Sequence, residues 1–178
     1  MFKKIIKYIF TYKVINFFFK IYVKLIFLFP KYSSSQNFWN INTVDSPSNG
    51  FKDIKESLKH LKWRNSQYLE CEKNMRFKNA NKKIILDYGC GPGNGLVNII
   101  TNCVPSKILA VDVSDKAIKL AKKRMSLHKT DVTFFKINEN EKINLIKSES
   151  IDIIKCDGVL HHIEDMGFIL SELHRILK

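Results

Sequence analysis

The sequence lacks the cysteine patterns of a disulfide scaffold or a structural zinc site. Its four cysteines form no C-x-x-C pair and no even framework, and stand at Cys71, Cys90, Cys103 and Cys156. This arrangement favours a reducing compartment and argues against a structural metal, so we expect no bound metal ion. At 178 residues, with 45% of them apolar, the chain suits one domain with a sizeable core.

Acidic residues are missing from the first 31 positions, although the whole chain has 17 of them. Seven lysines stand in the same segment and supply more than half of the net charge of +13. The remaining positive charge is scattered over expected helix faces, without clustered arginines or interleaved aromatic residues. We therefore expect solvated helix faces and no nucleic-acid partner.

A long uncharged apolar run is also missing from the N-terminal segment. Lysines interrupt its Phe, Ile, Tyr and Val residues, so no run approaches the ~18 residues of a spanning helix or forms the apolar core of a signal peptide. On a helix, one stripe is formed by Lys13, Lys20, Lys24 and Lys31. We predict a basic helix over residues 1–31 lying on an anionic membrane surface, which would make the protein cytoplasmic and peripheral to the inner face of a membrane. Alternatively, this helix packs against a partner, or a biased genome inflates the pattern.

Residues 32–51 contain the polar stretches YSSSQN and SPSNG after Pro30, and they predict a linker. The third region, residues 52–178, begins with a helical pattern that includes Trp63, Arg64 and Tyr68. These three side chains either contribute to a ligand pocket or belong to a capping helix with Trp63 in the core and Arg64 in solvent.

The most informative feature is KKIILDYGCGPGNG, residues 82–95, in which an apolar strand runs into Asp87 and then into alternating glycines. A helical segment, LVNIITNCV, follows directly, so its first N–H groups would point at whatever the loop holds. The dinucleotide pattern G-x-G-x-x-G fails in both possible registers, because Asn94 and Leu96 stand where its third glycine is needed. We predict a cofactor loop for a ligand without a pyrophosphate.

This combination of strand, acid and alternating glycines resembles motif I of the class I S-adenosylmethionine (SAM)-dependent methyltransferases, in their type 11/12-like domain. A second strand, KILAVDV, ends at Asp112, an acid that could bind the two ribose hydroxyls of a nucleoside and would suit NAD equally well. Ser114 then caps a helix, and two more strands and a closing helix follow in DVTFFKI, SIDIIKCDGVLHHIED and FILSELHRILK. The order predicts an α/β fold: a Rossmann-like parallel sheet with flanking helices.

The resemblance implies a set of cofactor-binding residues. Asp87 would help to orient the methionine amino group, the glycines would let the backbone approach the ligand, and Asp112 would bind ribose. The nearest match to the family's adenine-binding acid is Asn138, whose amide carbonyl can still accept that hydrogen bond. The full predicted set is Asp87, Gly89, Cys90, Gly91, Gly93, Asp112, Val113, Asn138 and Cys156.

His161 and His162 follow the fourth strand, near where the family's methyl group emerges, and either could deprotonate an acceptor at neutral pH. Their other interpretations are a packing histidine or a helix start beside Glu164 and Asp165. Adjacent histidines do not share a helix face, which disfavours a metal site. Transfer from a sulfonium needs no nucleophilic serine or cysteine, since the protein mainly holds the two reactants in line.

The leading functional prediction is SAM-dependent methyl transfer to a small-molecule or lipid-like acceptor. Two alternatives are a non-catalytic SAM- or nucleoside-binding module and an NAD-dependent oxidoreductase. The resemblance covers roughly residues 52–178, and the family's sheet usually continues with three more strands. We therefore expect a fragment or truncated gene product with an open edge at its fourth strand.

Overall fold

The structure, a computed structural model, describes residues 35–178 except 43–45, 69–76, 78 and 139–140. The chain divides into two compact units, residues 1–38 and residues 39–178, and the second unit contains the sheet. The helix predicted over residues 1–31 lies outside the described residues. Within the described part of the chain, no helix has the length and apolar character needed to cross a membrane.

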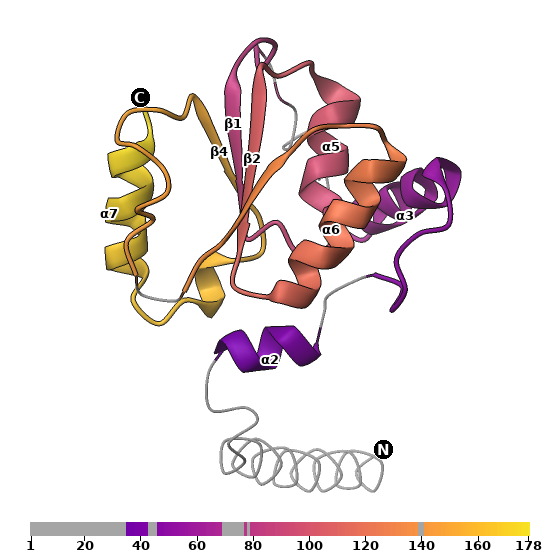
Figure 1. The fold of residues 1–178 in the computed structure, drawn as a ribbon, viewed down its shortest axis with the longest axis horizontal. Coiled ribbons are helices and arrows are strands. Elements are labelled where there is room, and N and C mark those ends of the chain that lie inside the picture. Colours follow the sequence, from indigo (N-terminus) through magenta and orange to yellow (C-terminus); the bar gives the residue numbers. More distant parts are fainter. Residues whose placement is uncertain (1–34, 43–45, 69–76, 78, 139–140) are drawn as a thin grey trace, which may run out of the picture. The chain divides into compact units, whose positions relative to one another are not determined.

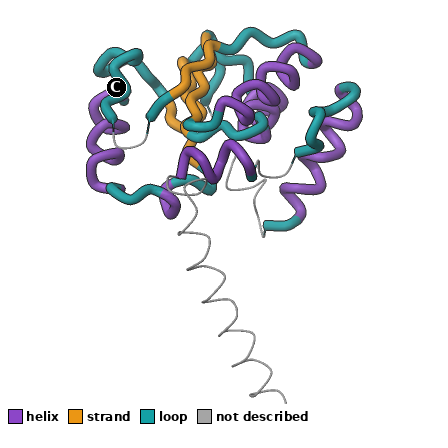
Figure 2. Tube along the Cα trace, turned by 60° about the horizontal axis from the view of Figure 1, so that its bottom comes forward, coloured by secondary structure: helices purple, strands orange, loops and turns teal. Residues whose placement is uncertain are grey.

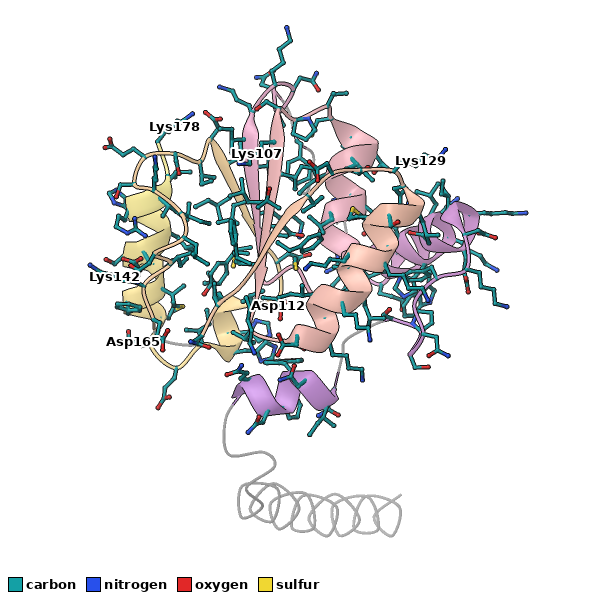
Figure 3. The ribbon with its side chains drawn as sticks, viewed as in Figure 1. Lys107, Asp112, Lys129, Lys142, Asp165 and Lys178 are labelled. Atoms are coloured by element: carbon teal, nitrogen blue, oxygen red, sulfur yellow. The ribbon has the colours of Figure 1, made fainter. Side chains whose placement is uncertain are left out.

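Four parallel strands form the predicted Rossmann-like sheet. They are β1 (Ile84–Tyr88), β2 (Lys107–Asp112), β3 (Thr133–Lys136) and β4 (Ile153–Cys156), in the order β3-β2-β1-β4. All four strands run in one direction, so their carboxyl ends meet at one edge of the sheet. Figure 3 shows Asp112 at this edge and Lys107 at the other end of β2. The predicted fold class is thus confirmed.

Helices cover both faces of the sheet. α3 (Ile54–Ser66), α5 (Asn94–Asn102) and α6 (Asp115–Leu127) lie on one side and α7 (Met166–Ile176) on the other (Figure 1). Figure 2 shows the strands between these two groups of helices. Each face has its own apolar core: Ile85 and Leu96 belong to the first, and Leu86 and Ile169 to the second. Alternate residues of β1 thus serve opposite faces, as the period of a strand requires.

Local signals explain where the helices begin. Ser114 caps α6 through its side chain, which accepts a hydrogen bond from the Ala117 N–H, as the sequence predicts. Asp165 caps α7 in the same way at Phe168, so the helix start expected near the two histidines is made by Asp165. Within α6, Ala117, Ala121 and Met125 recur at helical spacing and are buried.

A buried arginine fixes α3 beside the other two helices of its face. Arg124 of α6 donates to the hydroxyl and carbonyl of Ser57 in α3 and to the side-chain oxygen of Asn94 at the start of α5. Its guanidinium carbon lies 4.1 Å from the centre of the Phe51 ring. Burial lowers the pKa of Arg124 to about 10, which leaves the side chain charged at neutral pH.

The predicted linker, residues 32–51, contains a helix, α2 (Ser35–Ile41). The Trp39 carbonyl accepts a hydrogen bond from the Ser114 hydroxyl at 3.1 Å, and the Ile41 carbonyl accepts one from the Lys116 ammonium at 3.3 Å. The prediction weighted the polar residues around this segment and missed the apolar side chains inside it. At least Trp39 to Ile41 therefore belong with the sheet unit and are not a free connection.

Strand β4 lies at one edge of the sheet, as predicted, and β3 lies at the other. At the entrance of β4, Ile151 forms an isolated parallel bridge with Leu177, and the Lys178 N–H donates to the Ile151 carbonyl at 2.9 Å. Residues 153–156 pair with β1 alone among the described residues.

Candidate cofactor site

The glycine loop connects β1 to α5 at the carboxyl edge of the sheet. The N–H groups of Gly89 and Cys90 both donate to the Val111 carbonyl of β2, at 2.9 and 3.0 Å. These bonds fasten the beginning of the loop to the neighbouring strand. The carboxyl edge of an open parallel sheet is also where ligands bind in folds of this class.

Asp112, the last residue of β2, holds the middle of the loop. One of its carboxylate oxygens accepts from the Gly91 N–H at 2.8 Å and the other from the Ser114 N–H at 2.9 Å. Burial raises the pKa of Asp112, while these backbone hydrogen bonds act to lower it. A carboxylate has about four lone-pair sites, so acceptor capacity remains for a ligand's hydroxyl groups.

The three glycines predicted to face a ligand have different surroundings. A Cβ on Gly89 would collide with Val159, which follows β4, and a Cβ on Gly93 would contact Ala121 and Arg124. Gly91 differs, because no described residue lies within 4 Å of the place a Cβ would occupy and its φ is +50°. Gly89 and Gly93 therefore allow the loop to pack against the protein, and Gly91 is the position where the backbone is open to a ligand.

Asp87 lies beneath the loop in β1, with only 1% of its surface exposed. One carboxylate oxygen is 3.5 Å from the ammonium of Lys155, and the other accepts no hydrogen bond within the described part of the chain. A Cβ on Gly95 would lie 2.3 Å from that second oxygen, so Gly95 provides the space for Asp87 against the first turn of α5. Burial raises the pKa of Asp87, and Lys155 partly offsets this effect.

The sequence interpretation missed Lys155 and Asp157, which extend this pair into a chain of charges. The Lys155 ammonium lies 3.5 Å from an Asp157 carboxylate oxygen, and Arg64 of α3 donates to the same oxygen at 2.6 Å. Burial acts to raise the pKa of Asp157, but Lys155 and Arg64 together bring it below its usual value. Of these four charged residues, Asp87 alone belongs to the predicted cofactor-binding set.

The helix before the loop differs from the predicted capping arrangement, while a contribution to a ligand pocket stays a prediction. Arg64 is mostly buried and pairs with Asp157, so it does not extend into solvent. Trp63 is half exposed rather than part of the core, and Tyr68 is more exposed still. The positions of these side chains follow from the helical register of α3. Leu61 and Asn65 face the protein interior, which directs Arg64 toward β4 and Trp63 toward solvent.

Three other predicted site residues lie near the same edge. Cys90 is buried in the loop, and burial raises the pKa of its thiol well above the usual range. Cys156 ends β4, and burial raises its pKa to about 11. Both thiols are therefore protonated at neutral pH, which gives them the character of small apolar groups. Val113 is half buried between Asp112 and Ser114.

Asn138 lies beyond β3 and is exposed. Its amide group donates to the Glu141 carboxylate at 2.9 Å. Among the described residues the amide carbonyl has no hydrogen-bond donor, so an adenine contact remains a prediction.

His161 and His162 form the short 3₁₀ helix η2 (Leu160–His162), with ring centres 3.9 Å apart. The His162 ring also packs edge-on against Trp39, at 4.8 Å. Partial burial and the neighbouring His161 lower the pKa of His162, which favours a neutral imidazole that can accept a proton. The contact with Trp39 fits the packing interpretation, and the neutral imidazole fits the catalytic one.

Comparison with known proteins places this chain in a family. The chain is 32% identical over 85 residues to the release factor glutamine methyltransferase of Flavobacterium psychrophilum, covering 47% of this chain and 28% of that protein. It is 26% identical over 98 residues to the ubiquinone biosynthesis O-methyltransferase of Nitrosomonas europaea, covering 55% of this chain and 40% of that protein. The matches thus span well under half the length of these curated relatives.

A solved structure agrees with the fold. The S-adenosylmethionine-dependent methyltransferase of Mesorhizobium loti superimposes with a TM-score of 0.53 at 22% identity, covering 64% of this chain and 50% of that one. The family described as "Methyltransferase domain" matches residues 79–178, which are more than half of the chain and include the whole sheet. The protein therefore belongs to the methyltransferase domain family and has the class I, Rossmann-like fold of SAM-dependent methyltransferases.

Proposed function

We propose that this chain binds SAM at the carboxyl edge of β1 and β2 and takes part in methyl transfer to a small-molecule or lipid-like acceptor. The observation that supports this most directly is the loop around Gly91. Its backbone is open to a ligand at Gly91, and the Gly91 N–H donates a hydrogen bond to the Asp112 carboxylate. Family membership supports SAM as the cofactor.

The residues of the site fit the chemical groups of SAM. The unpartnered oxygen of Asp87 suits an ammonium group, and the remaining lone pairs of Asp112 suit two ribose hydroxyls. The open backbone at Gly91 allows close approach of a ligand without a side-chain clash. When bound, SAM supplies a methyl group attached to a sulfonium sulfur, and this sulfur is itself the leaving group.

The chain's own residues then hold and orient the two reactants and exclude water from the site. Cys90 and Cys156, both uncharged at neutral pH, contribute apolar walls near the strand ends. His162, with its lowered pKa, would accept the proton that an acceptor hydroxyl or amine loses as it is methylated. Trp39 packs against this ring and would limit its orientations.

Two considerations support a small or lipid-like acceptor. The relative from Nitrosomonas europaea is named for ubiquinone biosynthesis, whose product is a lipid-like quinone. The basic, apolar segment of residues 1–31 suits a protein that meets its acceptor at a membrane surface. The relative from Flavobacterium psychrophilum is named for a protein acceptor, so a protein substrate is the alternative to test.

The central experiment measures binding and turnover separately. Isothermal titration with SAM and with NAD should show binding of SAM alone. Transfer of a labelled methyl group should then be measured with a polyprenylated catechol and with a release-factor protein as acceptors. Binding of NAD in place of SAM would support the oxidoreductase alternative, and SAM binding without turnover on any acceptor would support a binding module.

We further propose that residues 1–31 attach the protein to the inner face of a membrane. Each lysine near an anionic surface contributes ~1 kcal/mol, which salt screens. The full chain should therefore sediment with anionic vesicles at low salt and less with neutral vesicles or at high salt. A matched variant with Lys13, Lys20, Lys24 and Lys31 changed to glutamine should lose the difference between the two vesicle types. Equal sedimentation with both types at every salt concentration would contradict the proposal.

A further inference from the structure

Lys155 is a charged residue in the middle of an apolar strand. Its neighbours in β4 are Ile153, Ile154 and Cys156, and only 8% of Lys155 is exposed. In the parallel register it lies directly opposite Asp87, and both side chains point to the face covered by α3 and α5. A lysine is almost never buried without a partner, so its partners indicate why it is there.

The charges around Asp87 come from β4, the residue after it, α3 and β2, whereas α5 has no charged residue. β4 contributes Lys155, the position after β4 contributes Asp157, and α3 contributes Arg64 through its bond to Asp157. Asp112 of β2 is the other acid close enough to act on this site, where the nearby thiols are those of Cys90 and Cys156. Lys155 is the cation in direct contact with Asp87, and Arg64 reaches it through Asp157.

The arrangement leaves one half of Asp87 available. Lys155 approaches one carboxylate oxygen, and the other, against Gly95, has no hydrogen bond within the described residues. A pair that served only to stabilise the fold would be expected to satisfy both oxygens, because a buried acceptor without a partner costs free energy.

We propose that Lys155 is a positioning residue that keeps Asp87 ionised and directed toward the cofactor's ammonium group. This inference rests on the proposed SAM-binding function and deepens it. Without Lys155, a fully buried Asp87 would hold a proton at neutral pH more readily, because burial favours the neutral form of a carboxylic acid. A neutral acid attracts an ammonium group far less than a carboxylate does.

The test replaces Lys155 with methionine, which has a similar length and no charge, and measures SAM affinity by isothermal titration from pH 5.5 to 7.5. Titration of SAM and of the histidines is common to all variants, so the informative quantity is the ratio of the Lys155→Met Kd to the wild-type Kd. We expect this ratio to be about tenfold at pH 5.5, one pKa unit's worth of interaction, and to decrease as the pH rises. Lys155→Arg should keep the wild-type profile.

A second measurement, the melting temperature without SAM, should change in the opposite direction. In Lys155→Met the folded-state pKa of Asp87 is raised above its unfolded value. The contribution of Asp87 to stability is then full below the unfolded pKa and is lost as the pH rises through the folded pKa. The variant should therefore melt progressively below the wild type between pH 5.5 and 7.5, although its SAM affinity approaches the wild-type value over the same range.

Two controls separate charge compensation from packing. Lys107→Met removes an exposed lysine at the other end of β2 and should leave both pH profiles unchanged. Adding Asp87→Asn to Lys155→Met removes the titrating group, so the double variant should follow the pH profile of Asp87→Asn alone. If Lys155→Met does not fold and the double variant does, the lone carboxylate is the cause, as proposed. If neither folds, Lys155 is needed for packing and the inference is overturned.

The outcomes distinguish this inference from the function on which it rests. SAM binding by the wild type with a Kd ratio that does not vary with pH would overturn the role of Lys155 alone. Absence of SAM binding by the wild type at every pH would overturn the proposed function together with the inference.

Discussion

Asp87 and Asp112 lie near the carboxyl ends of neighbouring parallel strands, and the protein buries them in different ways. Asp87 pairs with Ala110, two residues before Asp112, and the two acids are 1% and 8% exposed. Asp112 has backbone N–H groups on both of its oxygens, at 2.8 and 2.9 Å. Asp87 has a lysine 3.5 Å from one oxygen and no hydrogen bond to the other among the described residues.

The different partners of the two carboxylates indicate different tasks, shaping the loop for Asp112 and binding the ligand for Asp87. Backbone donors fix the carboxylate of Asp112 to the loop, so this residue shapes the site as well as offering its remaining lone pairs to a ligand. Lysine compensates the charge of Asp87 without using all of its acceptors, which leaves an oxygen for binding. We therefore expect Asp112 substitutions to damage both structure and affinity, and Asp87 substitutions to damage mainly affinity.

The largest effect should come from the loop that Asp112 holds. Gly91→Val introduces a branched side chain into the space open to a ligand and forces it to adopt a φ of +50°. We expect SAM affinity to fall at least about a hundredfold, which corresponds to roughly 2.7 kcal/mol. Isothermal titration would measure the loss.

Gly50→Val is a matched control for this prediction. Gly50 also has a positive φ, of +78°, and the nearest described atoms to its Cβ would be those of the flexible side chains of Lys123 and Leu120. The two variants should show similar losses in melting temperature, whereas only Gly91→Val should lose binding. Normal binding by Gly91→Val would show that the loop is structural and that the ligand lies elsewhere.

An intermediate effect should separate the two acids directly. Asp112→Asn places an amide NH2 against one of two backbone donors and should cost about 1–3 kcal/mol of unfolding free energy, together with SAM affinity. Asp87→Asn can place its NH2 on the side that has no donor, and Asp157 still compensates Lys155, so its loss of stability should be smaller. Urea unfolding and titration with SAM would give both values. Equal losses of stability in the two variants would contradict the comparison.

The elements could be predicted from sequence because each depends on local signals. A few consecutive residues are enough to predict the aliphatic strands, the Ser114 cap and the helical spacing of Ala117, Ala121 and Met125. Asp87 and Asp112 could be placed at one edge because parallel strands share a direction. The main local failure, helix α2, came from a segment whose polar residues resemble a linker.

The contacts of the site depend on register, which the sequence leaves open. Lys155 opposes Asp87 only because β4 pairs with β1 in one alignment, and a shift by one residue would turn it to the face of α7. Gly89, Gly91 and Gly93 are equivalent in the motif, yet their surroundings differ because Val159, Ala121 and Arg124 come from elsewhere in the chain. A lysine between Ile154 and Cys156 in an apolar strand was the one signal that could have predicted a buried partner, since such a charge must be compensated.

The smallest effect on SAM affinity is expected at the far end of the charge chain, where Arg64 of α3 pairs with Asp157 after β4. The Arg64–Asp157 pair and the Lys136–Asp115 pair have the same length, 2.6 Å, but the side chains of the first are 14% and 18% exposed and those of the second 41% and 66%. Breaking the buried pair with Arg64→Met should cost about 1–3 kcal/mol, because it also leaves Asp157 less compensated. Breaking the exposed pair with Lys136→Met should cost about 0.2–1 kcal/mol, since water and salt screen it.

Urea unfolding of both variants at low and high salt would measure this difference. Salt should reduce the cost of Lys136→Met and change that of Arg64→Met less, because ions screen exposed charges more than buried ones. SAM affinity should fall only a few-fold in Arg64→Met, because Lys155 still lies beside Asp87 when Asp157 loses its arginine. A loss of affinity as large as that of Asp87→Asn would mean that the state of Asp87 depends on the whole chain of charges as far as α3, and that its direct contact with Lys155 is not sufficient.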